Sequence, residues 1–173
     1  PTDFVDLMFS DDKSCSTCEM IYRLIERWGE ASKLSINTAS CIYCGIMTDS
    51  GSFRFPSVSP KTHQIAAALI ETGMDHSKIH SRVYDSSREG KLKLIGYALS
   101  EKLQVFPKFH AAIISLSAAE LERFGYEKGD TEGLVNTALS IEGVNFAAFI
   151  HESKDRIKMS FRSVGDFSAR DFS

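Results

Sequence analysis

Asp49 is the first candidate in this sequence for a residue that takes part in chemistry. It lies in Thr48-Asp-Ser-Gly51, a cluster of turn-forming residues that follows a helical apolar pattern. A carboxylate at such a helix exit is well exposed, and it offers hard oxygen ligands that suit Mn²⁺ or Mg²⁺. Because Asp-Ser-Gly is also an ordinary turn, a purely structural role for Asp49 stays open at this point.

A second group of candidates lies on one segment, 156–163, which alternates polar and apolar residues as a β-strand does. The alternation predicts that one face is cationic, with Arg156, Lys158, Ser160 and Arg162, and that the other is apolar. The cationic face could be the solvated side of an antiparallel sheet. That is the usual arrangement for an alternating strand, but the face could also border a cleft and bind a phosphate, which the guanidinium of Arg162 can hold in bidentate fashion.

The four cysteines form two Cys-x-x-Cys pairs, and such spacing is typical of a tetrahedral zinc site. Zinc-binding pairs usually lie on tight turns, whereas Cys41 and Cys44 lie inside a helical apolar pattern, so we expect buried, reduced thiols. The pairs are Cys15/Cys18 and Cys41/Cys44. A non-catalytic interaction module stabilised by zinc is the alternative from another class, and the zinc content of the protein distinguishes the two. His76 and His80 are expected at the surface, because no third ligand is spaced to join them.

Capping and breaking signals predict a helical first half. Ser16 and Glu19 stand in capping-box register before a helix that ends at Gly29, and a second helix is expected at about 37–47. Ser59-Pro60 begins a third helix that Gly73 closes, and Asp75 can cap a short fourth.

The pattern changes after residue 88. Helical spacing continues to about 103 and predicts an interdomain helix, followed by a strand at 110–116 and a short helix capped by Ser117 and Glu120. A short helix near Leu134, a strand at 144–150, a turn at 153–155 and a strand at 156–163 follow. The fold class is therefore α/β in two lobes: a mainly helical part at 1–87, the interdomain helix at 88–104, and an α/β part with a β-hairpin at 105–173.

Composition limits the partners. The net charge of -3 argues against generalised binding of long nucleic acid, including long duplex DNA, and leaves a local phosphate site. No apolar run approaches the roughly 18 residues of a membrane span, and no signal pattern opens the chain, so we expect a cytoplasmic protein. Both ends look cut, because the chain begins with Pro1 and 165–173 resembles the start of an amphipathic helix. The sequence leaves a homodimer open.

The segment from Cys41 to Phe53 resembles the fourth motif of the DHH phosphoesterase family, a small-residue helix that runs into T-D-[TS]-G-x-F. The resemblance continues through Phe55, where the family has an aromatic strand end, and through Ser59-Pro-x-Thr62. Upstream and downstream segments are similar to the oligoribonuclease branch of the family and its substrate-binding domain, so that nearly the whole chain is covered. They are 4–7, 16–19, 129–136 and 158–163.

The resemblance implies a two-metal site, usually manganese with magnesium as the alternative, that hydrolyses a phosphoester with metal-activated water. It implies that Asp49 is a metal ligand, and that Arg162 and Ser163 contact the terminal nucleotide or its phosphate. Lys158, on the same cationic face as Arg162, is a further substrate-binding candidate. The family's earlier aspartates, its DHH triplet and its Gly-Gly-Gly-His loop are missing from these 173 residues, so we expect the chain alone to be inactive.

The function that the resemblance implies for the parent enzyme is hydrolysis of short oligoribonucleotides and of 3'-phosphoadenosine 5'-phosphate. A cyclic-dinucleotide phosphodiesterase and an exopolyphosphatase of the same family are the alternatives.

Overall fold

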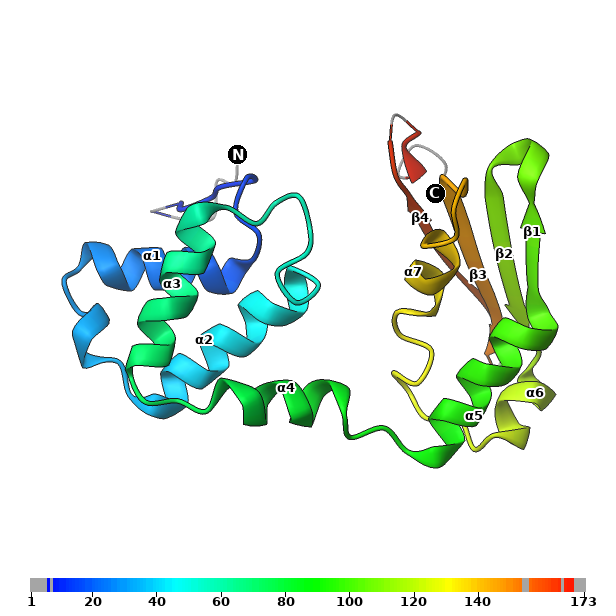
Figure 1. The fold of residues 1–173 in the computed structure, drawn as a ribbon, viewed down its shortest axis with the longest axis horizontal. Coiled ribbons are helices and arrows are strands. Elements are labelled where there is room, and N and C mark those ends of the chain that lie inside the picture. The colour runs from blue at the N-terminus through cyan, green and yellow to red at the C-terminus, as the bar shows by residue number, and fades with distance from the viewer. Residues whose placement is uncertain (1–5, 7, 154–155, 166, 170–173) are drawn as a thin grey trace. The chain divides into compact units, whose positions relative to one another are not determined.

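The computed structural model describes residue 6 and residues 8–153, 156–165 and 167–169. Phe4 and most of the predicted turn at 153–155 lie outside the described residues, as does part of the predicted helix start at 165–173. The chain separates into two compact units, 1–86 and 87–173 (Figure 1). In the described part, no helix is both long enough and apolar enough to cross a membrane.

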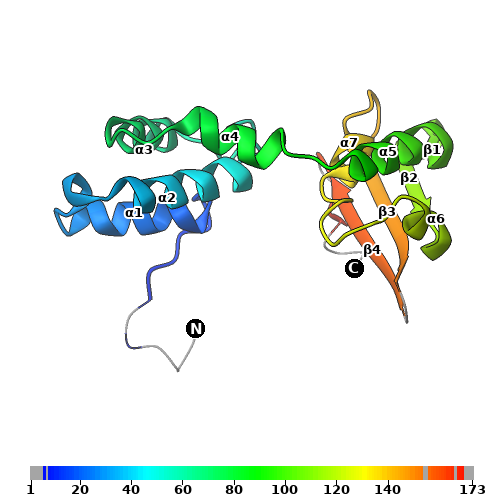
Figure 2. The same ribbon diagram turned by 90° about the horizontal axis from the view of Figure 1, so that it is seen from below.

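The first unit is built from four α-helices within the described residues: α1 (Thr17–Arg27), α2 (Ile36–Asp49), α3 (Pro60–Glu71) and α4 (His76–Tyr84). A 3-10 turn, Ala31–Lys33, separates α1 from α2. Figure 2 shows α1 and α2 in one layer, with α3 and α4 in the layer over it. The buried side chains of α2 and α3 form the centre of this core, and they include Ile42, Ile46, Met47, Ile65 and Leu69.

The predicted helix starts are confirmed by their caps. Ser16, Ser59 and Asp75 accept hydrogen bonds from backbone N–H groups in the first turns of α1, α3 and α4. Ser59 forms a full capping box with Thr62. The box predicted for α1 is only half formed, because the Glu19 side chain bonds to Cys15 and Thr62 instead.

The second unit is a mixed sheet with helices on one face. Its described residues form four strands in the order β1 (Leu103–Phe106), β2 (Ala111–Leu116), β3 (Phe146–Ser153) and β4 (Arg156–Ser163). β2 and β3 are parallel, whereas β1 and β4 pair antiparallel with their neighbours. The predicted hairpin is therefore confirmed as β3–β4. Strand β1 was not predicted, because its four residues follow directly on a helical pattern.

The helices of this unit cover one face of the sheet. They are α5 (Glu89–Tyr97), which continues as a π-helical turn at Ala98–Lys102, α6 (Ala118–Arg123) and α7 (Leu134–Leu139). Leu94 of α5 is fully buried in the same core as Ile114 of β2 and Phe149 of β3. The helix predicted as an interdomain element therefore contributes to the core of the second unit.

Strand β4 keeps the predicted alternation but not the predicted burial. Arg162 pairs with Ala147, and Lys158 pairs with His151, so both cations lie on the face that the helices cover. The apolar residues of β4 point to the opposite face, where Ile157 is 61% and Met159 is 55% exposed. Because β4 is the last strand of the described sheet, its cations lie beyond the part of the face that is buried.

Candidate functional site

Asp49 is the last residue of α2, and Ser50 is the C-cap. The helix runs two residues further than predicted, so Asp49 belongs to its final turn. Its carboxylate is exposed and makes no hydrogen bond or ion pair with any of the described residues. A carboxylate at the carboxyl end of a helix also faces the negative end of the helix dipole. The arrangement leaves two anionic oxygens free at a position that favours a cation.

The turn after Asp49 has an unusual backbone. Gly51, Ser52 and Phe53 all lie in the left-handed region, with φ of 58°, 61° and 65°. Glycine is needed at 51, because a Cβ there would lie 2.5 Å from the ring of Phe55. Serine and phenylalanine in this region each cost on the order of 1–3 kcal/mol, so the surrounding structure has to hold them. The resemblance implied a strand end at Phe55, whereas the described chain forms turns there.

Aromatic rings hold this turn against α2. The Phe53 ring lies 5.7 Å from that of Tyr43 and is stacked at 5.7 Å on His63. Tyr43 is buried, and its hydroxyl is 3.2 Å from Nε2 of His80. His76 also contacts the Tyr43 ring, edge-on at 6.4 Å. His76 is exposed as expected, whereas His80 is half-buried because it packs on this ring.

The cysteines are free thiols as expected, but only Cys15 among them is buried. Cys15 is buried, and burial, with the Glu19 carboxylate nearby, raises the pKa of its thiol to about 11. Cys41 is exposed, because it lies on the side of α2 away from Ile42 and Ile46. Cys18 packs on Gly45 of α2, and burial, followed by the charge of Asp49, raises the pKa of its thiol. No three His, Cys, Asp or Glu side chains among the described residues converge on a site that could hold a metal ion.

The second candidate group lies on β4 in the other unit. Arg162 is exposed, and its guanidinium donates to the carbonyl of the adjacent Phe161 at 2.9 Å. Lys158 is exposed four residues earlier on the same face. Ser163 is half-buried, lies on the opposite face, and accepts a hydrogen bond from the Ala169 N–H at 2.9 Å. The strand therefore presents Arg162 and Lys158 together, while the Ser163 hydroxyl already has a partner.

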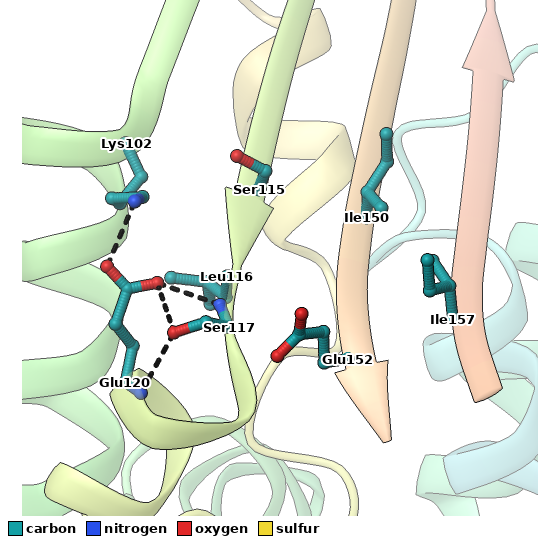
Figure 3. A pocket seen from close by; sticks show the side chains of 8 residues that line it. All are labelled: Lys102, Ser115, Leu116, Ser117, Glu120, Ile150, Glu152 and Ile157. Carbon is teal, nitrogen blue, oxygen red and sulfur yellow. Dashed lines mark hydrogen bonds and ion pairs between the residues drawn. The ribbon is translucent and has the colours of Figure 1, made fainter. Parts of the chain in front are cut away.

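A cavity of about 310 Å³ lies at the carboxyl ends of the parallel strands β2 and β3 (Figure 3). Its charged groups are already paired. Lys102 lies 2.9 Å from Glu120, and Glu152 accepts the Ala118 N–H at 2.8 Å. Tyr97 donates to the same Glu120 carboxylate at 2.6 Å. This cavity therefore offers no unpaired cation to a phosphate, and the candidate phosphate ligands lie on β4 instead.

The comparisons with known proteins agree on one group of relatives. The bifunctional oligoribonuclease and PAP phosphatase NrnA of Bacillus subtilis is 32% identical over 166 residues, which cover 92% of this chain and 50% of that protein. The protein of the same name from Thermus thermophilus is 28% identical over 167 residues, which cover 96% of this chain and 49% of that protein. No protein-family model matches the chain.

A solved structure is similar over nearly the whole chain. The crystal structure of an exopolyphosphatase-related protein from Bacteroides fragilis superposes with a TM-score of 0.94 at 40% identity, over 99% of this chain and 50% of that one. The α/β fold in two units is therefore that of a DHH-family protein, as the resemblance implied. The chain is homologous to the DHH-family oligoribonuclease and PAP phosphatases, and it spans about half the length of the relatives it matches.

Two residues near Asp49 were not singled out in the sequence as part of a site. Ser50 is fully buried, although it lies in a turn of polar residues. Phe53 lies in the left-handed region, and its ring is clamped between Tyr43 and His63. The only sequence signal for either is the motif itself, because the burial of Ser50 and the left-handed backbone of Phe53 depend on packing that the residue types do not indicate.

Proposed function

We propose that the parent protein is a metal-dependent phosphoesterase that hydrolyses short oligoribonucleotides and 3'-phosphoadenosine 5'-phosphate. The observation that carries the proposal is the free, exposed carboxylate of Asp49, at the end of α2 and inside the motif that resembles the family. The names of the Bacillus and Thermus relatives, oligoribonuclease and PAP phosphatase, support the substrate class.

Asp49 suits a hard divalent cation, and we propose manganese, with magnesium as the alternative. The cation would neutralise a carboxylate that the helix dipole disfavours, and the oxygen ligand has the hardness that both metals prefer. A bound metal supplies Lewis-acid activation of water and of the phosphoryl group. Because the described residues hold no complete set of metal ligands, we expect the 173 residues alone to be inactive.

Arg162 and Lys158 would bind the phosphate of the substrate. Both side chains are exposed, and neither forms an ion pair with the described residues. Arg162 can offer two parallel N–H donors to a phosphate, and Lys158 adds a point charge on the same face. Ser163 is the third candidate, but it lies on the opposite face of β4 from Arg162 and Lys158, and its hydroxyl oxygen already accepts the Ala169 N–H.

The charge of the chain supports a short substrate. A net charge of -3 leaves little excess cation for a long backbone, whereas two cations on one strand suit one or two phosphates. We accordingly propose no binding of long duplex DNA and no membrane partner. A cytoplasmic location follows from this substrate class, because short RNA and the bisphosphonucleotide occur where RNA is turned over.

Inorganic polyphosphate is the second candidate substrate, since the Bacteroides protein with 40% identity is described as exopolyphosphatase-related. The experiment is a substrate panel with the full-length protein and Mn²⁺. It contains di- to pentaribonucleotides, the bisphosphonucleotide, a cyclic dinucleotide and polyphosphate. We expect rapid release of mononucleotides and of phosphate from the first two. Turnover of polyphosphate alone would replace the proposal with the second candidate, and an inert protein would refute both.

A further inference from the structure

Ser50 is fully buried and forms hydrogen bonds on every polar atom it has. Its N–H donates to the Ile46 carbonyl at 3.0 Å, and its hydroxyl donates to the Met47 carbonyl at 3.3 Å. The same hydroxyl accepts the N–H of Phe53 at 3.0 Å. The Ser50 carbonyl accepts the N–H groups of Arg54 and Phe55, at 3.0 and 3.1 Å. One residue thus ties the last turn of α2 to the far side of the left-handed turn.

The left-handed turn would not keep its shape without such support. Ser52 and Phe53 adopt φ values that L-residues rarely take, and a chain freed from Ser50 would relax toward ordinary values. Helix ends fray when they are not held, and Asp49 is the residue at this end. The direction of the Asp49 carboxylate therefore depends on the hydrogen bonds of Ser50 that hold the turn.

We propose that Ser50 is a positioning residue, which directs the Asp49 carboxylate toward the metal by holding the strained turn at the end of α2. The inference rests on the proposed function, because it requires Asp49 to be a metal ligand. Ser50 would not contact the metal itself, since its hydroxyl is buried and already shared between Met47 and Phe53. It acts as the partners behind metal ligands do, by restricting where the ligand can point.

Ser52 provides a matched control. It lies in the same turn with a similar φ of 61°, it is half-buried, and its hydroxyl makes no hydrogen bond within the described residues. Ser52→Ala removes the same atom as Ser50→Ala, two positions further on. A difference between the two variants therefore reports the hydrogen bonds of Ser50 rather than the loss of a serine.

The test measures the affinity of the full-length protein for Mn²⁺, from the electron paramagnetic resonance signal of the free ion. We expect Ser50→Ala to raise the dissociation constant roughly tenfold, as loss of a partner behind a metal ligand typically does. Ser52→Ala should match the wild type, and Ser50→Thr, which keeps the hydroxyl, should recover most of the affinity. Circular dichroism of each metal-free variant checks that it is folded.

The outcomes separate this inference from the proposed function. If Asp49→Asn leaves Mn²⁺ affinity unchanged, Asp49 is not a ligand and both proposals fail. If Asp49→Asn weakens binding but Ser50→Ala does not, only the positioning role is overturned. If Ser50→Ala unfolds the first unit, the hydroxyl supports the whole core rather than one carboxylate, and the inference is overturned as well.

Discussion

The buried carboxylate of Glu19 on α1 accepts a hydrogen bond of 2.8 Å from the hydroxyl of Thr62 on α3, 43 residues further along the chain. The same oxygen accepts the Cys15 thiol at 2.9 Å. Glu19 is only 3% exposed, and Thr62 also accepts the N–H of Ser59 at the start of α3. The contact therefore joins α1 to the capping box that begins α3, in the unit that carries Asp49.

Removing this carboxylate should destabilise the first unit. Glu19→Ala removes the buried oxygen that accepts both the Thr62 hydroxyl and the Cys15 thiol, and we expect a loss of about 2–3 kcal/mol in unfolding free energy. Glu19→Gln keeps an acceptor oxygen and should lose less. Glu26→Ala is the control, because Glu26 joins the same two helices through an exposed ion pair with Lys61. Urea unfolding followed by the fluorescence of Trp28 measures these differences, and equal losses for Glu19→Ala and Glu26→Ala would contradict the prediction.

Glu120 should make the second unit sensitive to acid. The hydroxyl of Tyr97, then the Ser117 N–H and Lys102, lower the pKa of its carboxyl from 4.5 to about 2. Because the folded pKa is depressed, the stabilisation is complete above the unfolded pKa near 4.5 and is lost as pH falls toward 2. The side chain is 18% exposed, so we expect this loss to be about 1–3 kcal/mol.

Amide signals of β2 in NMR spectra, recorded in urea at pH 5 and pH 3, follow this loss in the second unit alone. Glu120→Gln should flatten the dependence on pH between these values. Glu122→Gln on the same helix α6 serves as the comparison, because Glu122 is exposed. If the stability of the second unit falls between pH 5 and pH 3 as steeply in Glu120→Gln as in the wild type, other carboxyl groups cause the acid sensitivity.

Asp49→Asn should separate folding from activity. The variant removes a negative charge from the carboxyl end of α2, so the unfolding free energy should stay within about 0.5 kcal/mol of the wild type or rise slightly. Turnover should collapse, since the metal loses an anionic ligand. Activity of the full-length enzyme on a dinucleotide at limiting Mn²⁺ measures this effect. Unchanged turnover would remove Asp49 from the site.

Arg162 should affect the binding of phosphate but not of metal. Loss of a charge-assisted bidentate contact typically costs ~1.5–3 kcal/mol, so Arg162→Ala should lower kcat/KM on a dinucleotide roughly ten- to a hundredfold. Arg162→Lys should recover part of the loss, because lysine keeps the charge but not the planar fork. Mn²⁺ affinity should remain at the wild-type value in both variants.

Two further variants on the same strand provide kcat/KM values with which Arg162→Ala can be compared. Lys158→Ala should lower kcat/KM less, since one ammonium makes a single point contact. Arg156 lies on the same face about 20 Å from Arg162, given ~3.3 Å per residue, and Arg156→Ala should be silent. Wild-type kinetics for Arg162→Ala would identify Arg162 as a solvated strand residue.

The features that local chemistry determines could be predicted from the sequence. Ser16, Ser59, Asp75 and Ser117 cap the helices that they were expected to cap, because a cap depends on residues within three positions of it. The alternation of β4 was predicted for the same reason. Its strand bounds, Arg156–Ser163, agree with the prediction.

Contacts between distant residues could not be predicted in this way. Glu19 was expected to close a capping box in α1, but a hydroxyl from α3 uses its carboxylate instead. The alternation of β4 did not indicate which face the helices cover, since that depends on its pairing with Ala147 and Phe149 of β3. The left-handed angles of Ser52 and Phe53 do not follow from their residue types, because Phe53 packs on Tyr43 and His63 in the folded structure.

The position of β4 at the edge of the described sheet has a consequence for aggregation. An exposed edge with apolar side chains such as Ile157 and Met159 can pair with strands of other molecules, and charged residues along the edge are a common protection against this. Arg156, Lys158 and Arg162 are charges of this kind, and we expect their repulsion between copies to oppose such pairing. Neutralising all three would therefore expose the protein to aggregation as well as weaken its hold on phosphate, whereas single substitutions leave enough charge to keep it dispersed.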